Sequence, residues 1–412
     1  MTKMDRRTFL KTTAAGASAA AVGSMLPHAA LGADDIVVAQ IHDQSGGLDI
    51  YGKAMVECFD LALDEINANG GLLGRKLRGV NFDPQSNMQL YAQYAQQAAL
   101  KDRAVVVHGG ITSASREVIR PVLKRFNTLY FYNTLYEGGV CDRNQFATGT
   151  TPAQTVEKLV PYCIDRFGPK IYTIAADYNY GQITSDWVIK YARDNGGEVV
   201  TTEFFPLDVA DFTTTISKIQ AAKPDLVMSA LVGGAHMSFY RQWAAAGMKD
   251  EIPVASTTFG AGQENVALTA EEGRGIIYAC GYFEDLDTPA SKAFLERYRA
   301  KYGAEHSYLT ELPVATYEGV HLWAKAVNQA GSLDRMKVIE ALETGMSFDG
   351  PSGKVTIDPK THHCSRSAFI AECENQRFKF LASYENQFPA DTAAVCNLEA
   401  NPNDNQQYKI EI

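Results

Sequence analysis

The sequence predicts an α/β protein of two doubly wound, three-layer lobes joined by several hinge crossings. From residue 35 onward, short runs rich in β-branched residues alternate with longer amphipathic stretches, which is typical of parallel sheets covered by helices. This alternation occurs once before and once after about residue 151. Helical stretches then follow one another directly, and because helices alone cannot extend a sheet, we expect them to return and cover the first lobe.

The first set of elements is marked by a clear helical stripe. Met55, Phe59, Leu63 and Ile66 recur at spacings of four, four and three, and the stretch ends at Asn69-Gly70-Gly71. The expected strands are 36–41, 77–82, 104–108 and 129–132, and the expected helices are 52–69, 88–101 and 115–126. Together they predict one layered α/β lobe.

The second set repeats the pattern from about Thr150-Thr151-Pro152. The expected strands are 170–175, 198–204, 226–230 and 253–256, and the expected helices are 181–195, 211–222, 234–246 and 263–272. Helices 289–302, 312–329 and 334–344 follow, and then 353–357 and 366–384, which we interpret as strands or a hairpin at the edge of the second lobe. The predicted lobes are 33–151 plus 282–350, and 152–281 plus 351–412 with a C-terminal extension.

Composition excludes several classes of function. The 412 residues include 38 basic and 48 acidic ones, a formal net charge of -10, which is unfavourable for binding nucleic acid. Only residues 14–31 approach the length of a membrane span, and that stretch is mostly Ala, Gly and Ser, interrupted by Pro27 and His28. We therefore expect no nucleic-acid partner and no direct membrane span.

Residues 1–32 have the pattern of an export signal. Asp5-Arg6-Arg7-Thr8-Phe9-Leu10-Lys11 precedes a weakly apolar run that ends in Ala30-Leu31-Gly32, a small-x-small cleavage site. The paired arginines before Phe-Leu-Lys resemble a twin-arginine signal. A basic, frayed N-terminus is the alternative interpretation. We expect export by the twin-arginine route to the periplasm.

The cysteines predict at least one unpaired thiol, because their number is odd. The seven are Cys58, Cys141, Cys163, Cys280, Cys364, Cys373 and Cys396. Their spacing does not fix a pairing, although the C-terminal tail has the most to gain from a covalent tie. His362-His363-Cys364 lacks the paired ligand spacing of a metal site, so we expect no metal and no cofactor.

Candidate ligand contacts follow the predicted strands, because open α/β sheets bind ligands at the carboxyl ends of their strands. These strand ends carry small, hydroxyl or aromatic residues and no recognisable catalytic set. The candidates are Ser113, Tyr132, Thr134, Tyr178, Tyr180 and Gly234. For Ser113 the alternative is a helix N-cap, and for the tyrosines it is packing at a lobe surface.

Five stretches resemble the type I periplasmic binding proteins, in particular the branch with the urea-binding and short-chain-amide-binding proteins of branched-chain amino acid type importers. They are Glu65–Arg75, Thr112–Arg116, Tyr136–Gly138, Asp287–Phe294 and Ser352–Asp358. The resemblance implies an extracytoplasmic solute-binding component of an ABC importer, which is not an enzyme and whose partners are a small-molecule ligand and membrane permease subunits.

Carried over by position, the resemblance implies that Ser113 and nearby amides hold a ligand oxygen, with Tyr132 and Thr134 beside it and Tyr178 closing from the second lobe. Glu264 occupies the position where amino-acid binders place an acid for the ammonium group, and Asp177 is the other candidate. A carboxylate at Glu264 is also favourable simply because a helix starts there. Two departures from the amide binders are Ile111, before the serine pair, and Gly181, where they have proline.

Two ligand classes and one rival function remain open. Urea or a short-chain amide is the preferred ligand, and a branched-chain or other amino acid is the next. The rival is a secreted hydrolase acting on a small amide-like substrate. The sequence contains no Gly-x-Ser-x-Gly elbow, no His-Glu-x-x-His zinc motif and no phosphate loop, which disfavours that rival.

Overall fold

The first sheet is entirely parallel and has the strand order β2-β1-β3-β4-β6 in the computed structural model, which describes residues 35–303 and 306–410. The predicted signal at 1–32 lies outside the described residues. The strands are β1 (Ile36–Ile41), β2 (Leu77–Phe82), β3 (Val106–Gly109), β4 (Leu129–Tyr132) and β6 (Gln145–Ala147). All but β6 were predicted from the sequence.

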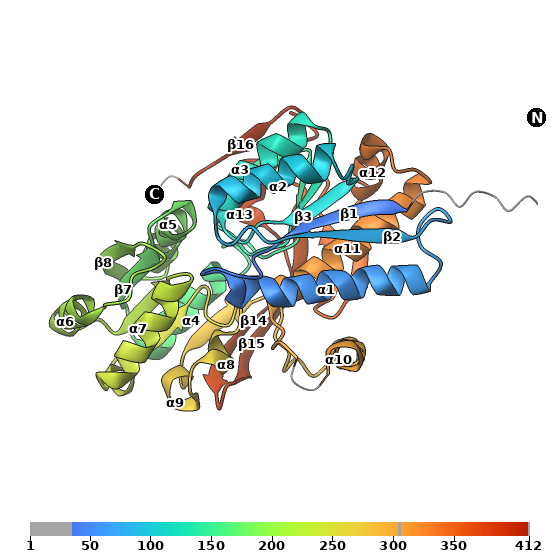
Figure 1. The fold of residues 1–412 in the computed structure, drawn as a ribbon. Coiled ribbons are helices and arrows are strands. Elements are labelled where there is room, and N and C mark those ends of the chain that lie inside the picture. The colour runs from blue at the N-terminus through green and yellow to red at the C-terminus, as the bar shows by residue number, and fades with distance from the viewer. Residues whose placement is uncertain (1–34, 304–305, 411–412) are drawn as a thin grey trace, which may run out of the picture. The chain divides into compact units, whose positions relative to one another are not determined.

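Helices cover both faces of this sheet (Figure 1). One face packs against α2 (Met88–Leu100) and α3 (Ser113–Arg125). The other packs against α1 (Asp49–Ala68) and the late helices α11 (Glu311–Ala330) and α12 (Arg335–Leu342), and α10 (Pro289–Tyr302) packs against α1. The apolar stripe of α1, including Phe59, packs with Trp323 of α11 in one buried cluster. The expected return of the late helices to the first lobe is confirmed.

The second sheet has the order β12-β13-β14-β11-β10-β9-β7-β8, with β15 paired to β14. Its parallel strands are β7 (Lys170–Ala176), β8 (Glu198–Phe205), β9 (Leu226–Ala230), β10 (Val254–Ser256) and β11 (Ile277–Cys280). The antiparallel strands are β12 (Ser347–Gly350), β13 (Gly353–Ile357), β14 (Cys364–Glu374) and β15 (Arg377–Gln387). The predicted hairpin at the edge of the second lobe is therefore confirmed.

The helices of the second lobe are α4 (Val156–Phe167), α5 (Asn179–Asp194), α6 (Thr213–Ala222), α7 (Gly234–Ala245), the 3-10 helix η1 (Met248–Asp250), α8 (Glu264–Ala267) and α9 (Ala270–Gly273). The prediction of one helix over 263–272 was wrong, because α8 and α9 are separate. Leu268 has an extended backbone, and the side chain of Thr269 accepts a hydrogen bond from the amide of Glu272. A capping box thus starts a new helix there.

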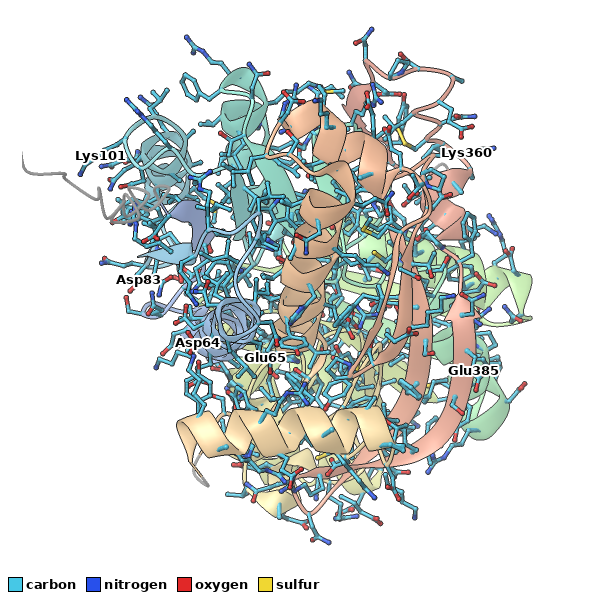
Figure 2. The ribbon with its side chains drawn as sticks, turned by 90° about the vertical axis from the view of Figure 1, so that its right-hand side faces the viewer. Asp64, Glu65, Asp83, Lys101, Lys360 and Glu385 are labelled. Carbon is cyan, nitrogen blue, oxygen red and sulfur yellow. A yellow bond between two sulfur atoms is a disulfide. The ribbon has the colours of Figure 1, made fainter. Side chains whose placement is uncertain are left out.

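The C-terminal tail contains α13 (Ala390–Ala393) and β16 (Asn405–Gln407). β16 pairs antiparallel with β5 (Val140–Asp142), in the segment between β4 and β6, and a disulfide joins Cys141 to Cys396. The carbonyl of Lys360, labelled in Figure 2, accepts a 2.7 Å hydrogen bond from the Leu398 amide. The lobe boundaries stay a prediction, but β16 lies beside a strand from the first part of the chain.

The remaining cysteines are free and buried: Cys58, Cys163, Cys280, Cys364 and Cys373. The prediction of at least one unpaired thiol is thus confirmed. Across residues 35–303 and 306–410, no cluster of three or more His, Cys, Asp and Glu side chains is arranged to hold a metal ion. No helix in this part of the chain combines the length and apolar character of a membrane span.

Candidate functional site

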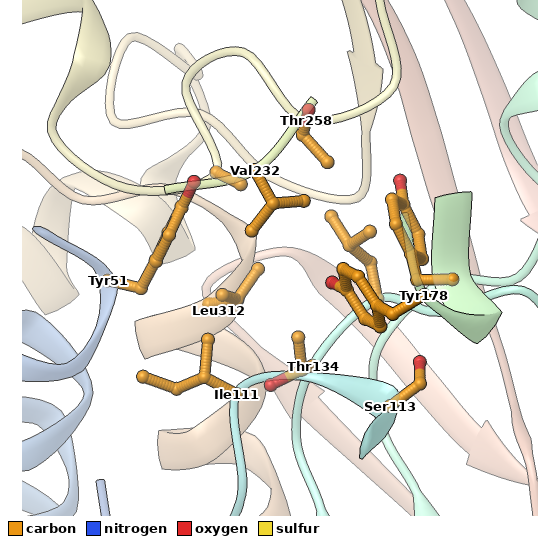
Figure 3. A pocket seen from close by; sticks show the side chains of 11 residues that line it. Tyr51, Ile111, Ser113, Thr134, Tyr178, Val232, Thr258 and Leu312 are labelled. Atoms are coloured by element: carbon orange, nitrogen blue, oxygen red, sulfur yellow. The ribbon is translucent and has the colours of Figure 1, made fainter. Parts of the chain in front are cut away.

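A cavity lies where the carboxyl ends of strands from both sheets face each other (Figure 3). Its empty volume is about 330 Å³, and this figure includes space that is open to solvent. One wall comes from the segments around the first sheet: Tyr51, Ile111, Ser113, Thr134, Leu135 and Leu312. The opposite wall comes from those around the second: Tyr178, Tyr180, Val232, Thr258 and Ala261.

Strand ends place most of these side chains. Ile111 and Ser113 follow β3, Thr134 follows β4, Val232 follows β9 and Thr258 follows β10. Parallel strands end at one edge of a sheet, so residues far apart in sequence meet there.

A glycine makes the turn after β3 possible. Gly110 has φ +83°, and a Cβ built there would lie 3.2 Å from both Ser115 Oγ and the Tyr130 hydroxyl. Positive φ together with this close approach favours glycine strongly. The tight turn brings Ile111 and Ser113 to the cavity wall.

Four of the seven predicted site residues line the cavity: Ser113, Thr134, Tyr178 and Tyr180. Tyr132 does not, and its buried hydroxyl donates to the carbonyl oxygen of Ile111 at 3.1 Å, beneath the cavity wall. Gly234 is the first residue of α7 and also lies outside the lining. Glu264 is the third predicted residue outside it.

Sequence reasoning missed several lining residues. Thr258 and Val232 each lie two residues after the end of β10 and β9, so the rule about strand ends would have found them. Tyr51 lies in the first turn of α1 and Leu312 in the first turn of α11. No local pattern marks those two positions, because only the packing of α1 and α11 brings them to the cavity.

The hydroxyls of the lining residues Ser113, Thr134 and Thr258 already donate their protons to protein acceptors. Thr134 Oγ1 donates to the carbonyl oxygen of Gly110 at 3.1 Å, and Thr258 Oγ1 donates to that of Leu231 at 2.7 Å. The Ser113 hydroxyl donates to Oε2 of the buried Glu137. Since each hydroxyl has one proton and two lone pairs, what remains for a ligand is the lone pairs.

The N-terminus of α3 supplies donors beside these acceptors. Thr112 is the N-cap, since its side chain accepts from the Ser115 amide at 3.1 Å in a capping box. The alternative that Ser113 is the N-cap was therefore wrong. The backbone amides of Ser113 and Ala114 have no acceptor within the described part of the chain, and the helix dipole favours an oxygen there.

Glu264 lies behind the cavity wall rather than in it. Its Oε2 accepts from the Gly262 amide at 2.9 Å. Burial raises the pKa of Glu264 to about 7, although hydrogen bonds from Gly262 and from the Tyr51 hydroxyl oppose the rise. Tyr51 belongs to the cavity lining, whereas Glu264, which it contacts, does not.

The tyrosines of the cavity are neutral over the physiological range. Burial raises the pKa of Tyr51 and of Tyr178 well above their usual value. The Tyr180 hydroxyl shares a 2.9 Å hydrogen bond with Thr257 Oγ1. The Tyr178 hydroxyl has no hydrogen-bond partner in the described ranges, so its proton is available to a ligand.

The lining of this cavity contains no Asp, Glu, Lys, Arg, His or Cys. Its hydroxyls have no adjacent imidazole or amine that would act as a general base toward a substrate. The arrangement can surround a small molecule with an apolar wall and a few fixed polar groups, which is the usual form of a binding pocket.

Comparison with known proteins also indicates a binding protein. The family model described as "Periplasmic binding protein domain" matches residues 36–395. A curated relative from Brucella melitensis, "Leu/Ile/Val-binding protein homolog 6", is 25% identical over 365 residues, covering 86% of this chain and 91% of the relative. "Leu/Ile/Val-binding protein homolog 7" of Brucella suis is 23% identical over 363 residues, covering 82% and 88%.

Solved structures share the fold. An ABC transporter solute-binding protein from R. palustris, in complex with 4-hydroxybenzoate, superposes with a TM-score of 0.78 at 22% identity, covering 88% of this chain and all of the other. A branched-chain amino acid transporter substrate-binding protein from Streptococcus pneumoniae, in complex with isoleucine, gives 0.74 at 22% identity, covering 85% and 99%.

Proposed function

The chain belongs to the periplasmic binding protein family, and from this we propose that it captures a small neutral solute bearing N–H groups for an ABC importer. Urea or a short-chain amide fits this description best. The observation that carries the proposal is the direction of the hydrogen bonds in the cavity, where Ser113, Thr134 and Thr258 all donate into the protein.

An amide group matches both the free backbone N–H groups at the start of α3 and the hydroxyl oxygens that accept hydrogen bonds. Its carbonyl oxygen accepts from the free amides of Ser113 and Ala114, and its NH₂ group donates to Ser113 Oγ and Thr134 Oγ1. A carboxylate in the same place would turn oxygen lone pairs toward those of the hydroxyls. A ligand that leaves buried polar groups without partners binds more weakly, so the amide is preferred.

A branched-chain amino acid is the second candidate. The names of the Brucella relatives favour it, and Glu264 occupies the position expected for an ammonium partner. Against it, Glu264 lies outside the lining, and burial of an ammonium without an anionic partner is costly. The apolar wall formed by Ile111, Val232 and Leu312 accommodates the body of either ligand.

Closure of the two lobes is the step that couples binding to transport. The Tyr51 hydroxyl, on the first lobe, accepts from the Gly233 amide of the second at 3.2 Å, so contacts across the cleft enclose the cavity. A ligand drives closure only by its higher affinity for the closed form. The closed form is then recognised by the membrane permease subunits.

The proposed location is the periplasm, reached by the twin-arginine route. The family supports an extracytoplasmic location, and the arginine pair Arg6-Arg7 supports the route. The secreted hydrolase is not supported, because the relatives are named as binding proteins.

Mass spectrometry of small molecules released on denaturing the purified protein identifies what it carries. Calorimetry with urea, acetamide, formamide, leucine, valine and glutamate then ranks the classes. We expect urea or an amide to bind and to be recovered unchanged. Tight binding of leucine or valine without binding of any amide contradicts the ligand class, and turnover of an amide or urea that a cavity mutation abolishes contradicts the binding function itself.

A further inference from the structure

Glu137 joins the cavity to a buried polar junction. Its side chain is fully buried, and Oε2 accepts from the hydroxyl of Ser113. Its Oε1 accepts from Arg116 Nη2 at 3.0 Å, from Asn179 Nδ2 at 3.3 Å and from the side-chain amide of Gln407. Four donors from α3, α5 and β16 thus surround one carboxylate that does not itself line the cavity.

These contacts fix the direction of the hydrogen bond from Ser113. The guanidinium of Arg116 is buried and forms an ion pair with the carboxylate of Glu137. An ionised carboxylate only accepts hydrogen bonds, so the Ser113 proton points to Glu137. Ser113 Oγ therefore turns a lone pair toward the ligand.

We propose that Glu137 determines which class of ligand the cavity accepts, by holding the Ser113 hydroxyl as an acceptor. This inference rests on the proposed function and explains how the site distinguishes an amide from the acid of the same shape. Glu137 is a positioning residue, since it acts on the ligand through Ser113.

Contacts from the second lobe hold this junction in place. The indole N–H of Trp187, on α5, donates to the carbonyl oxygen of Glu137 at 3.0 Å, and Asn179 lies at the start of the same helix. Asn179 adjoins Tyr178 and Tyr180, which line the cavity. The orientation of Ser113 is therefore fixed most firmly when the lobes are together.

The test compares amide–acid pairs of the same shape: acetamide with acetate, leucinamide with leucine, and benzamide with benzoate. Calorimetry gives the ratio of amide affinity to acid affinity for each pair that binds. We expect the wild type to favour the amide. In Glu137→Gln, the new amide can donate to Ser113 Oγ, which leaves the Ser113 hydroxyl proton free to donate to a ligand. The ratio of amide affinity to acid affinity is therefore expected to fall by about tenfold or more.

Two variants separate this role from a structural one. Glu318→Gln is the matched control, because Glu318 is likewise buried, binds Arg366 at 3.2 Å and accepts from the Ser352 hydroxyl at 2.5 Å, away from the cavity. It is expected to lower the melting temperature and leave the ratio unchanged. In a Ser113→Ala background, Glu137→Gln is expected to change the ratio by less than about threefold, because its effect passes through Ser113.

The outcomes are distinct. A wild type that favours acids contradicts the proposed ligand class but leaves Glu137 testable through the change in ratio. An unchanged ratio in folded Glu137→Gln, or an equal loss of affinity for both members of a pair, overturns the role of Glu137. If Glu137→Gln does not fold, Ser113→Ala alone must still lower the ratio. Failure of the wild type to bind any of the six overturns both proposals.

Discussion

Oε1 of Glu264 lies 3.8 Å from Nδ1 of His236, and both side chains are fully buried. Burial lowers the pKa of His236 to about 3 and raises the pKa of Glu264 to about 7. Neither atom has a hydrogen-bond partner among the described residues. The two groups are therefore both neutral between about pH 3 and 7, and they do not form an ion pair at neutral pH.

Glu264→Gln distinguishes a neutral ligand from an amino acid. Because the carboxyl lies outside the cavity lining, we expect acetamide affinity to change by less than about threefold. For an amino acid whose ammonium depends on Glu264, affinity would fall a hundredfold or more, since loss of a buried charge partner costs about 3 to 5 kcal/mol. Calorimetry on Glu264→Gln measures this. Asp177→Asn, at the exposed acid after β7, tests the other candidate for an ammonium partner in the same way.

Glu264 is also expected to make the free energy of unfolding depend on pH. Its pKa rises from 4.5 to about 7 on folding, so between these values the native state binds more protons than the unfolded state. Stability from this group is complete below pH 4.5 and falls by about 3 kcal/mol as pH rises through 7. His236 and the other buried histidines act in the opposite direction, so the measurable quantity is the difference between wild type and Glu264→Gln.

Guanidinium chloride unfolding at several pH values measures that difference, and it avoids urea, which is a candidate ligand. The variant is expected to gain stability relative to the wild type as pH rises from 5 to 8. A difference that stays constant over this range contradicts a raised pKa for Glu264.

Ser113→Ala and Thr112→Ala are expected to have separable effects. Ser113 lines the cavity, so its loss is expected to weaken ligand binding by about 1 to 3 kcal/mol. Thr112 caps α3, so its loss is expected to lower stability by about 1 kcal/mol. Calorimetry and melting curves on both variants check this. Unchanged affinity in Ser113→Ala with a lowered melting temperature would reject the ligand role.

The disulfide between Cys141 and Cys396 is expected to stabilise the fold by about 2 to 5 kcal/mol, because it closes a sequence separation of 255 residues in the unfolded chain. A reductant should therefore lower the melting temperature of the wild type. A double variant, Cys141→Ser with Cys396→Ser, should melt at that lower temperature with or without reductant. If the reductant lowers the melting temperature of the double variant as well, it acts at a site other than this disulfide.

The local pattern of the sequence determined much of this protein. The four-four-three spacing of Met55, Phe59, Leu63 and Ile66 was enough to predict α1, because one helix face must be buried. Strand ends likewise indicated Ser113, Thr134, Tyr178 and Tyr180, since parallel strands bring their carboxyl ends to one edge. For these residues the position along the chain decides the position in space.

The tertiary structure alone decided the contacts between distant segments. Tyr51 and Leu312 reach the cavity only because α1 and α11 pack side by side. Cys396 pairs with Cys141 because β16 returns to β5. The Ser113 hydroxyl donates its proton to Glu137 because the segment after β4 lies against the start of α3. Such contacts depend on how whole elements pack, and the periodicity of a single segment contains no information about which distant partner it meets.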